Sequence, residues 1–259
     1  MRAIWTGTIG FGLVNIPVKL YSAVQDSELD LDMLDSKDHS NIRYVRVNDK
    51  TGKEVPWKSI VKGYKIDNKY VVLTDEDFEK ASPKKTKTIE ITDFVNQDEI
   101  GILYYEMPYY LEPESSGTKA YALLREALKK TGKVAVGNFV MRSKQSLVVL
   151  KEVNGALALI RLRYYEEVRD IKDLKIPGKV TISAPELKMA TALIQQYTTK
   201  FDISDYKDTY TAELMKLIKA KSRGIKIKVP EMRVVHKDTR DLMSQLKASL
   251  NTPKKKKAS

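Results

Sequence analysis

The dominant hydrophobic period of this 259-residue chain changes from that of strands to that of helices in its C-terminal third, and this change limits the folds open to it. Up to about residue 165, apolar residues alternate with polar ones in short segments such as Ile42–Val47, as expected for half-buried strands. From Pro185 onward they recur at helical spacing. The segment Ile176-Pro177-Gly178 separates the two patterns. The sequence therefore predicts a mainly β, barrel-type core followed by helices.

One helix is expected inside the strand region, over residues 119–131. Its apolar residues fall on one stripe, and Gly132 provides a stop. Asp67-Asn68 and Asn154-Gly155 mark hairpin turns, and Thr74 is a suitable N-cap for a short helix over 75–81. Together these signals predict a β-barrel with a helical insertion.

The glycine-rich stretch Gly7–Gly12 raises the question of a phosphate-binding loop. Asn15 occupies the place of the third glycine of G-x-G-x-x-G, and the residues that follow are typical of a strand rather than a helix. The apolar alternation also shifts by one residue between Leu13 and Val14. We therefore expect a bulge or bend between two strand segments instead of a nucleotide site.

The two helical segments after residue 185 have apolar stripes that need a covering surface. They are too few to form a bundle of their own, so their stripes must be buried on the barrel or on another chain. A second subunit is the natural candidate. The predicted dimerisation residues are Leu187, Ile194, Tyr197, Phe201, Tyr206, Tyr210, Leu214, Leu217 and Ile218.

The C-terminal 35 residues have a different character. A short amphipathic helix through Leu242, Leu246 and Leu250 is expected to dock onto a partner protein. The lysines Lys254, Lys255, Lys256 and Lys257 close the chain in a segment expected to be disordered and able to hold phosphates. The expected organisation is a core over 1–175, a helical arm over 176–224 and a basic tail over 225–259.

The net charge of +12 is concentrated and sorted along the chain. Residues 216–259 hold 14 basic residues against 3 acidic ones, which leaves the rest nearly neutral. Within that rest, residues 41–65 hold 7 basic against 2 acidic residues, and residues 119–144 hold 7 against 1. The intervening residues 73–118 hold 11 acidic against 4 basic residues. This sorting predicts a surface with one positive side, suited to a polyanion.

The residues needed for catalysis or metal binding are not grouped in recognisable patterns. The chain has no cysteine, only two histidines and no motif of a hydrolase or a metalloprotease. The acidic run after Thr74 is explained by its place at a helix N-terminus. Without a signal-peptide pattern or a long apolar run, we expect a cytoplasmic protein that is not an enzyme and needs no metal or cofactor.

Several long segments resemble the bacterial Ku proteins. These segments are "FGLVNIPVKLY" (11–21), "TGKEV…IVKGY" (51–64), "FVNQDEI" (94–100), "YYLEP…KAYALLREAL…TGKVAV" (109–136) and "YKDTY…LIKAKSRG" (206–224). The resemblance implies a β-barrel with a helical arm, dimerised into a closed ring that threads onto double-stranded DNA ends. It also implies that the protein has no catalytic site and recruits a multifunctional ATP-dependent DNA ligase in non-homologous end joining.

The resemblance places the DNA-contacting bridge on the first basic block. Contacts with phosphate groups are then expected from Arg43, Arg46, Lys53, Lys58, Lys62, Lys129, Lys130, Arg142 and Lys144, with the terminal lysines adding affinity. The helix through Leu242, Leu246 and Leu250 becomes the candidate ligase contact. Asn138 stands where the family pattern leads us to expect an arginine, which removes one candidate contact.

Two other functions stay open on the residues alone. A sequence-independent RNA- or single-strand-binding barrel would stack bases on strand tyrosines, and the candidates are Tyr104, Tyr105, Tyr109 and Tyr110. An enzyme built on scattered acidic residues is the third possibility. Metal-dependent turnover of DNA would distinguish it from both binding proteins.

Overall fold

The computed structural model describes residues 1–81, 87–141, 144–225 and 242–251. The chain divides into two compact units. The first unit comprises residues 1–26 and 31–173, and the second comprises residues 27–30 and 174–259. Each is described on its own below.

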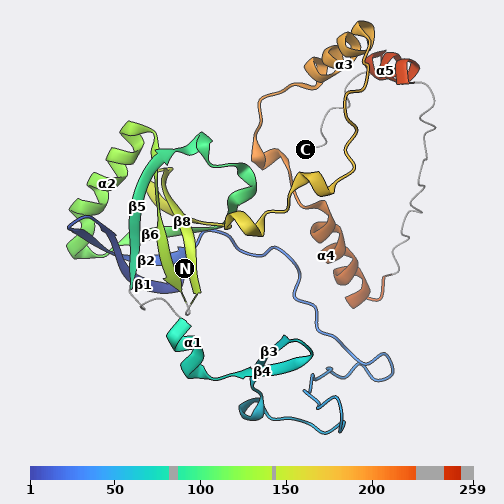
Figure 1. Ribbon diagram of the computed structural model, residues 1–259. Coiled ribbons are helices and arrows are strands. Elements are labelled where there is room, and N and C mark those ends of the chain that lie inside the picture. Colours follow the sequence, from blue (N-terminus) through green and yellow to red (C-terminus); the bar gives the residue numbers. More distant parts are fainter. Residues whose placement is uncertain (82–86, 142–143, 226–241, 252–259) are drawn as a thin grey trace. The chain divides into compact units, whose positions relative to one another are not determined.

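The first unit contains a closed barrel whose strands run in the order β1-β2-β6-β9-β8-β7-β5 (Figure 1). Neighbouring strands are antiparallel except β1 and β5, which pair in parallel. Their bounds are β1 Trp5–Phe11, β2 Val14–Ser22, β5 Thr88–Asn96, β6 Tyr105–Pro113, β7 Lys133–Met141, β8 Lys144–Val153 and β9 Ala156–Leu162. The expected barrel is therefore confirmed.

The barrel forms because alternate residues of each strand point into one apolar core. In β2, Ile16, Val18 and Leu20 are buried while the residues between them are exposed or half-buried. The helix α2 (Thr118–Thr131) adds Tyr121 and Leu124 to the same core. It ends at Gly132, as the sequence predicts. The helical insertion is thus held to the barrel by its apolar face.

The tyrosine of α2 also links two strands of the barrel. Its hydroxyl donates a hydrogen bond to the carbonyl oxygen of Leu111 in β6 and accepts one from the backbone N–H of Leu157 in β9, both at 2.7 Å. Burial raises the pKa of Tyr121 above its usual value. These two bonds fix α2 against the β6–β9 pair.

Outside the barrel, the first unit contains a two-stranded hairpin and a short helix. The hairpin is β3 (Lys62–Ile66) with β4 (Lys69–Leu73), and the helix is α1 (Asp75–Ala81). Asp67 and Asn68 form the tip of the hairpin, as predicted, and both have positive φ. At the start of α1, the Thr74 hydroxyl accepts a hydrogen bond from the backbone N–H of Asp77 at 3.3 Å.

One local prediction was wrong, and the structure decides between the two alternatives of another. Ile42–Val47 was expected to be a strand, but it contains a single isolated bridge, from Val47 to Glu54, and its apolar side chains are largely exposed. Alternation alone did not provide a neighbouring strand and a core face to stabilise it. Of the bulge or bend expected between two strand segments near Leu13 and Val14, the structure has the bend: it is a two-residue hairpin turn, because Phe11 pairs with Val14 and Gly12 has φ 54°.

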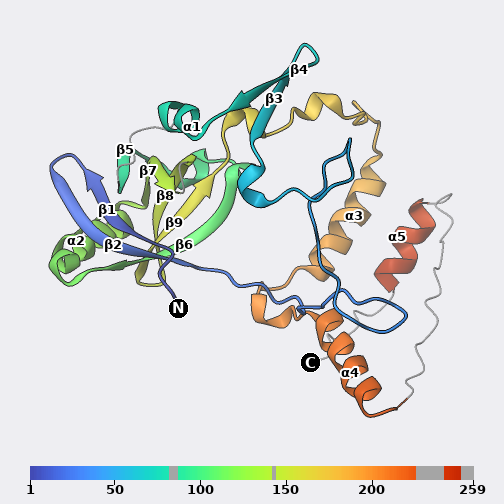
Figure 2. The same ribbon diagram turned by 90° about the horizontal axis from the view of Figure 1, so that it is seen from below.

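The second unit contains the helices α3 (Ala184–Tyr197), α4 (Thr209–Ser222) and α5 (Leu242–Asn251). Ser183 caps α3 through a capping box with Glu186, and the Asp208 side chain caps α4 by accepting from the N–H of Thr211. Helices α3 and α5 lie side by side (Figures 1 and 2). Short 3-10 helices complete the structure, at Trp57–Ser59, Gln97–Glu99, Ile102–Tyr104, Ser115–Gly117, Tyr165–Glu167, Ile171–Asp173 and Ile203–Asp205.

Candidate nucleic-acid interface

The first basic block lies on an exposed segment before and into the β3–β4 hairpin. The side chains predicted to contact phosphate are all exposed there, namely Arg43, Arg46, Lys53, Lys58 and Lys62. The segment buries none of its described residues between 41 and 66. Its cationic groups are therefore accessible to a large ligand, and as exposed charges they do not carry the desolvation cost of a buried charge.

A tight loop presents part of this block. Val47 pairs with Glu54 in an isolated bridge, and the N–H of Asn48 donates to the carbonyl oxygen of Lys53 at 2.8 Å. The Asn48 side chain in turn accepts from the N–H groups of Lys50 and Thr51. The Asn48 side chain thus fixes the loop conformation, and the side chains of Lys50 and Lys53 are exposed to solvent.

Two of the predicted cations lie over aromatic rings. The Arg46 guanidinium is 4.5 Å from the centre of the Trp57 ring, and the Lys62 ammonium is 4.8 Å from that of Phe78. Both distances are within the range of cation–π attraction. These contacts hold the cationic groups in place without cancelling their charge.

No acidic side chain neutralises the predicted phosphate contacts within the described part of the chain. The ion pairs found there are Arg125–Glu126, Arg161–Glu106, Lys172–Asp170 and Lys216–Glu213, and none includes a residue of the predicted set. Unneutralised, exposed Lys and Arg are what phosphate binding requires.

The second basic block, residues 119–144, runs from α2 to the first residue of β8. Lys129 and Lys130 are exposed at the end of α2, and Lys144 is exposed at the first position of β8. Asn138, the departure from the family pattern, accepts a hydrogen bond from the side-chain amide of Gln145 at 3.1 Å. Arg142 and Lys254–Lys257 lie outside the described residues.

The tyrosines proposed as a stacking platform do not form one. Tyr109 is only 6% exposed and belongs to the barrel core. Tyr104 and Tyr105 are half-buried against a second apolar cluster, which leaves Tyr110 as the most exposed of the four. This arrangement removes the specific support for base stacking on the barrel.

Sequence reasoning missed a different set of aromatic rings. Within the basic segment and its hairpin, Tyr44, Trp57, Tyr64 and Tyr70 are each more than 60% exposed. The available signal was their alternation with basic residues, as in Tyr44 between Arg43 and Arg46. The same alternation is typical of a half-buried strand, which hid this second meaning. A surface that mixes cations with open rings suits contact with nucleic acid.

Most of the predicted dimerisation residues are exposed within one chain. Leu187, Ile194, Tyr197, Phe201, Tyr206 and Tyr210 are 49–75% exposed, Ile218 is 38% exposed, and Leu214 and Leu217 are half-buried. Phe201 and Tyr206 stack on each other with ring centres 5.6 Å apart. Exposed apolar surface of this extent is typical of an interface with another protein.

The candidate ligase contact lies on α5. Leu246 and Leu250 are half-buried on this helix, which lies beside α3, and Leu242 is its first residue. The described residues contain no group of three or more His, Cys, Asp or Glu side chains placed to hold a metal ion. In the same residues, no helix combines the length and apolar character needed to span a membrane.

The fold and surface define a class: a closed β-barrel with a helical insertion and an exposed cationic segment. The family model "Ku70/Ku80 beta-barrel domain" matches residues 10–189. Three similar proteins each carry the name "Non-homologous end joining protein Ku". The one from Archaeoglobus fulgidus is 43% identical over 98% of this chain and 100% of its own length. Those from Pseudomonas aeruginosa (42% identity; 85% of this chain, 77% of the relative) and Bacillus subtilis (38%; 97% and 82%) are similar.

The chain belongs to the Ku family. This membership confirms the resemblance found in the sequence, and it agrees with the prediction that the protein is not an enzyme. Among solved structures, the SPOC domain of human PHD-finger protein 3 aligns with 63% of this chain and 99% of its own, at 12% identity and a TM-score of 0.29. That likeness is too weak to carry an argument.

Proposed function

We propose that two copies of this chain form a closed ring that binds double-stranded DNA ends without sequence preference, in repair by non-homologous end joining. The observation that carries the proposal is the exposed, unneutralised cationic segment of a Ku-family chain. Lys and Arg on phosphate groups release counterions and carry no base information. Such contacts suit a protein that must accept any broken end.

The uncovered helices of the second unit support the ring. Their exposed apolar side chains need a partner surface, and a second copy of the same chain supplies one by symmetry. We infer that residues 176–224 form the dimerisation arm and that the first basic block lines the DNA-binding side. A free DNA terminus can enter a closed ring, whereas a circle cannot, so selectivity for ends follows from topology.

We further propose that the protein recruits an ATP-dependent DNA ligase through the segment that contains α5, and that it acts in the cytoplasm at the nucleoid. The amphipathic pattern of Leu242, Leu246 and Leu250 supports this assignment. The terminal lysines would add DNA affinity. They would extend the cationic character of the protein.

The dependence of DNA binding on salt tests the phosphate contacts directly. Lys53→Ala and Lys62→Ala should each reduce the slope of log K against log salt by roughly 0.9, with sequence preference unchanged. Lys172→Ala is the matched control, because Lys172 is exposed and its ammonium lies 3.5 Å from the Asp170 carboxylate. Unchanged slopes in both lysine variants would remove residues 41–65 from the interface.

The open aromatic rings of the basic segment favour one alternative, a protein that stacks single-stranded bases. If that were its function, Trp57→Ala would weaken binding to a single-stranded oligonucleotide by about 1–3 kcal/mol and would change the salt slope little. For a ring on duplex ends, we expect tighter binding to a blunt duplex than to the single strand. Gel shifts with both substrates distinguish the two functions.

A further inference from the structure

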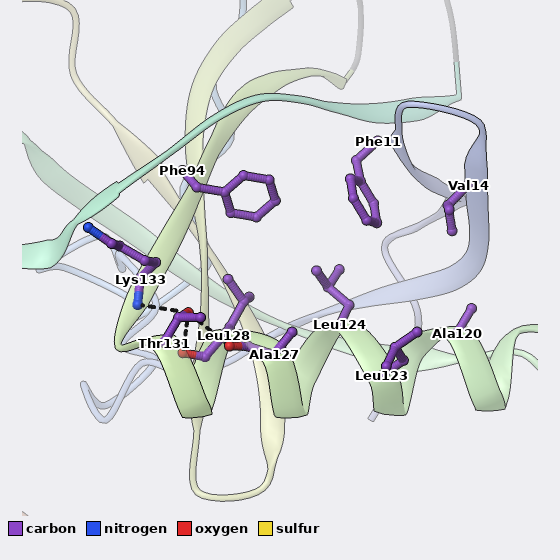
Figure 3. A pocket seen from close by; sticks show the side chains of 10 residues that line it. All are labelled: Phe11, Val14, Phe94, Ala120, Leu123, Leu124, Ala127, Leu128, Thr131 and Lys133. Carbon is purple, nitrogen blue, oxygen red and sulfur yellow. Dashed lines mark hydrogen bonds between the residues drawn. The ribbon is translucent and has the colours of Figure 1, made fainter.

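An apolar groove lies on the first unit, between α2 and the β1–β2 hairpin (Figure 3). It encloses about 390 Å³, within the range of roughly 300–1,000 Å³ usual for binding pockets. Phe11 and Phe94 point into it from above the helix, Leu124 and Leu128 of α2 form its floor, and Leu123 and Ala127 lie on its open side. The surface inside is almost entirely apolar.

The barrel topology explains why the groove exists. The strands β1 and β5 pair only over Thr8–Gly10 and Thr88–Glu90. Beyond these residues, β1 turns into its hairpin with β2, while β5 continues to Asn96 with β7 as its partner. The two strands therefore separate, and the edge-to-face rings of Phe11 and Phe94 span the gap between them, with centres 6.0 Å apart.

The side chains at the mouth of the groove are not needed for the barrel core. Leu124 is directed into the core and is almost fully buried, whereas Leu123 is 72% exposed. Val14 and Phe94 are also exposed at the rim. An uncovered apolar surface of this kind, around a concave site, is typical of a place where another molecule binds.

Lysines border this apolar surface. In a helix, side chains three and four residues apart are neighbours, so Lys119, Leu123, Ala127 and Lys130 form one row along the open side of α2. Both lysines are exposed. The acidic Glu126 next to this row is paired with Arg125 at 2.8 Å. The open side of the groove is thus apolar in the middle and cationic at both ends.

A third lysine closes the groove at the end of α2. Lys133 lines it and donates from its ammonium to the Asn96 side-chain oxygen at 2.7 Å. Glu99 is close to this pair. The pKa of its carboxyl is lowered by hydrogen bonds from Asn96 and, to a smaller extent, by the charge of Lys133. Even with Glu99 counted, basic groups outnumber acidic ones around the groove.

We propose that this groove is the docking site for a short segment of a partner protein, with two or three apolar side chains flanked by acidic residues. The apolar side chains would fill the space between Phe11 and Phe94, and the acidic ones would meet Lys119 and Lys130. DNA has no apolar anchors to offer this lining. The arm of a second copy is a poor match, because residues 184–222 hold six lysines against five acidic residues.

A displayed library of random peptides of about 12 residues, selected on the full chain, provides the probe. The selected peptides should carry apolar anchors and a net negative charge. Their Kd should then be at least about tenfold weaker on Leu123→Glu. Leu103→Glu is the control, since Leu103 is 67% exposed and does not line the groove. It should change the Kd by no more than about twofold.

A second pair of variants tests the rim charge. Lys130→Glu should weaken the selected peptides several-fold, and raised salt should reduce that difference. Lys129→Glu is the matched control, because it is on the same last turn of α2 but rotated by about 100° away from the groove. Circular dichroism of all four variants checks that each is folded.

Three results would overturn the proposal. The selected peptides could be basic or lack apolar anchors, or their binding could be unaffected by Leu123→Glu. Alternatively, Leu123→Glu could convert a dimer to a monomer in sedimentation velocity, which would assign the groove to a second copy. Linear DNA should bind Leu123→Glu and Leu103→Glu equally well, so the outcome is independent of the proposed DNA function.

Discussion

The hydroxyl of Tyr121 offers a sharp test of how the helical insertion is held to the barrel. Tyr121→Phe removes only this hydroxyl and leaves the backbone N–H of Leu157 and the carbonyl oxygen of Leu111 without their 2.7 Å partner. Tyr121 is 6% exposed, so water does not readily replace the lost bonds. Leaving buried backbone groups unsatisfied costs about 1–3 kcal/mol. We therefore expect the free energy of unfolding to fall by about 2 kcal/mol.

Urea unfolding measures this loss if one tryptophan reports on the core. Trp5 packs edge-to-face on Phe139 with ring centres 5.0 Å apart, and Trp57→Phe removes the only other tryptophan. In that background, Tyr121→Phe should lower the urea midpoint with little change of slope. Tyr165→Phe is the control, since Tyr165 is largely exposed. A loss below about 0.5 kcal/mol, or one equal to that of the control, would refute the assigned role of the hydroxyl.

Further predictions concern the strands, the helix caps and alkaline pH. A Cβ at Gly137 would clash with the carbonyl oxygen of Glu90. Gly137→Ala should therefore lower the free energy of unfolding, measured by urea unfolding, by about 1–3 kcal/mol. Gly178→Ala is the control and should cause no such loss, because the space around Gly178 is open. Hydrogen bonds from Thr211 lower the pKa of Asp208, so this cap stabilises α4 above about pH 4 and loses its effect in acid. The difference in helicity between the wild type and Asp208→Ala should therefore be clear at pH 6 and shrink near pH 2. A difference that stays constant with pH would contradict this reasoning. Because the pKa of Tyr121 is raised, its contribution should be complete below about pH 10 and fall above it, a loss that Tyr121→Phe should abolish.

The barrel and α2 could be predicted from sequence because their patterns are local and agree with their packing. Strands such as β2 alternate between buried and more exposed residues, and α2 has both an apolar stripe and a glycine stop. The segment Ile42–Val47 has the same alternation but no neighbouring strand, so the pattern was misleading there. Periodicity shows which side chains share a face, and it does not show whether anything covers that face.

The candidate site was predictable in part for the same reason. Charge sorting located the basic segment, and its lysines and arginines are indeed exposed. The cation–π contact of Arg46 with Trp57 depends on how one loop folds back, and the groove beside Leu123 depends on residues far apart in sequence. Neither has a local pattern. They arise from the way the loop folds back and from the separation of β1 from β5.

The central claim, a closed ring that recognises DNA ends by topology, is tested most directly with one duplex in two forms. The same sequence is prepared as a linear fragment and as a covalently closed circle, and binding of the full chain is compared by gel shift at moderate salt. The ring predicts binding to the linear form and little to the circle, with binding to the circle restored when it is cut once. Equal binding to both forms would mean that the basic residues hold DNA from outside, without a ring.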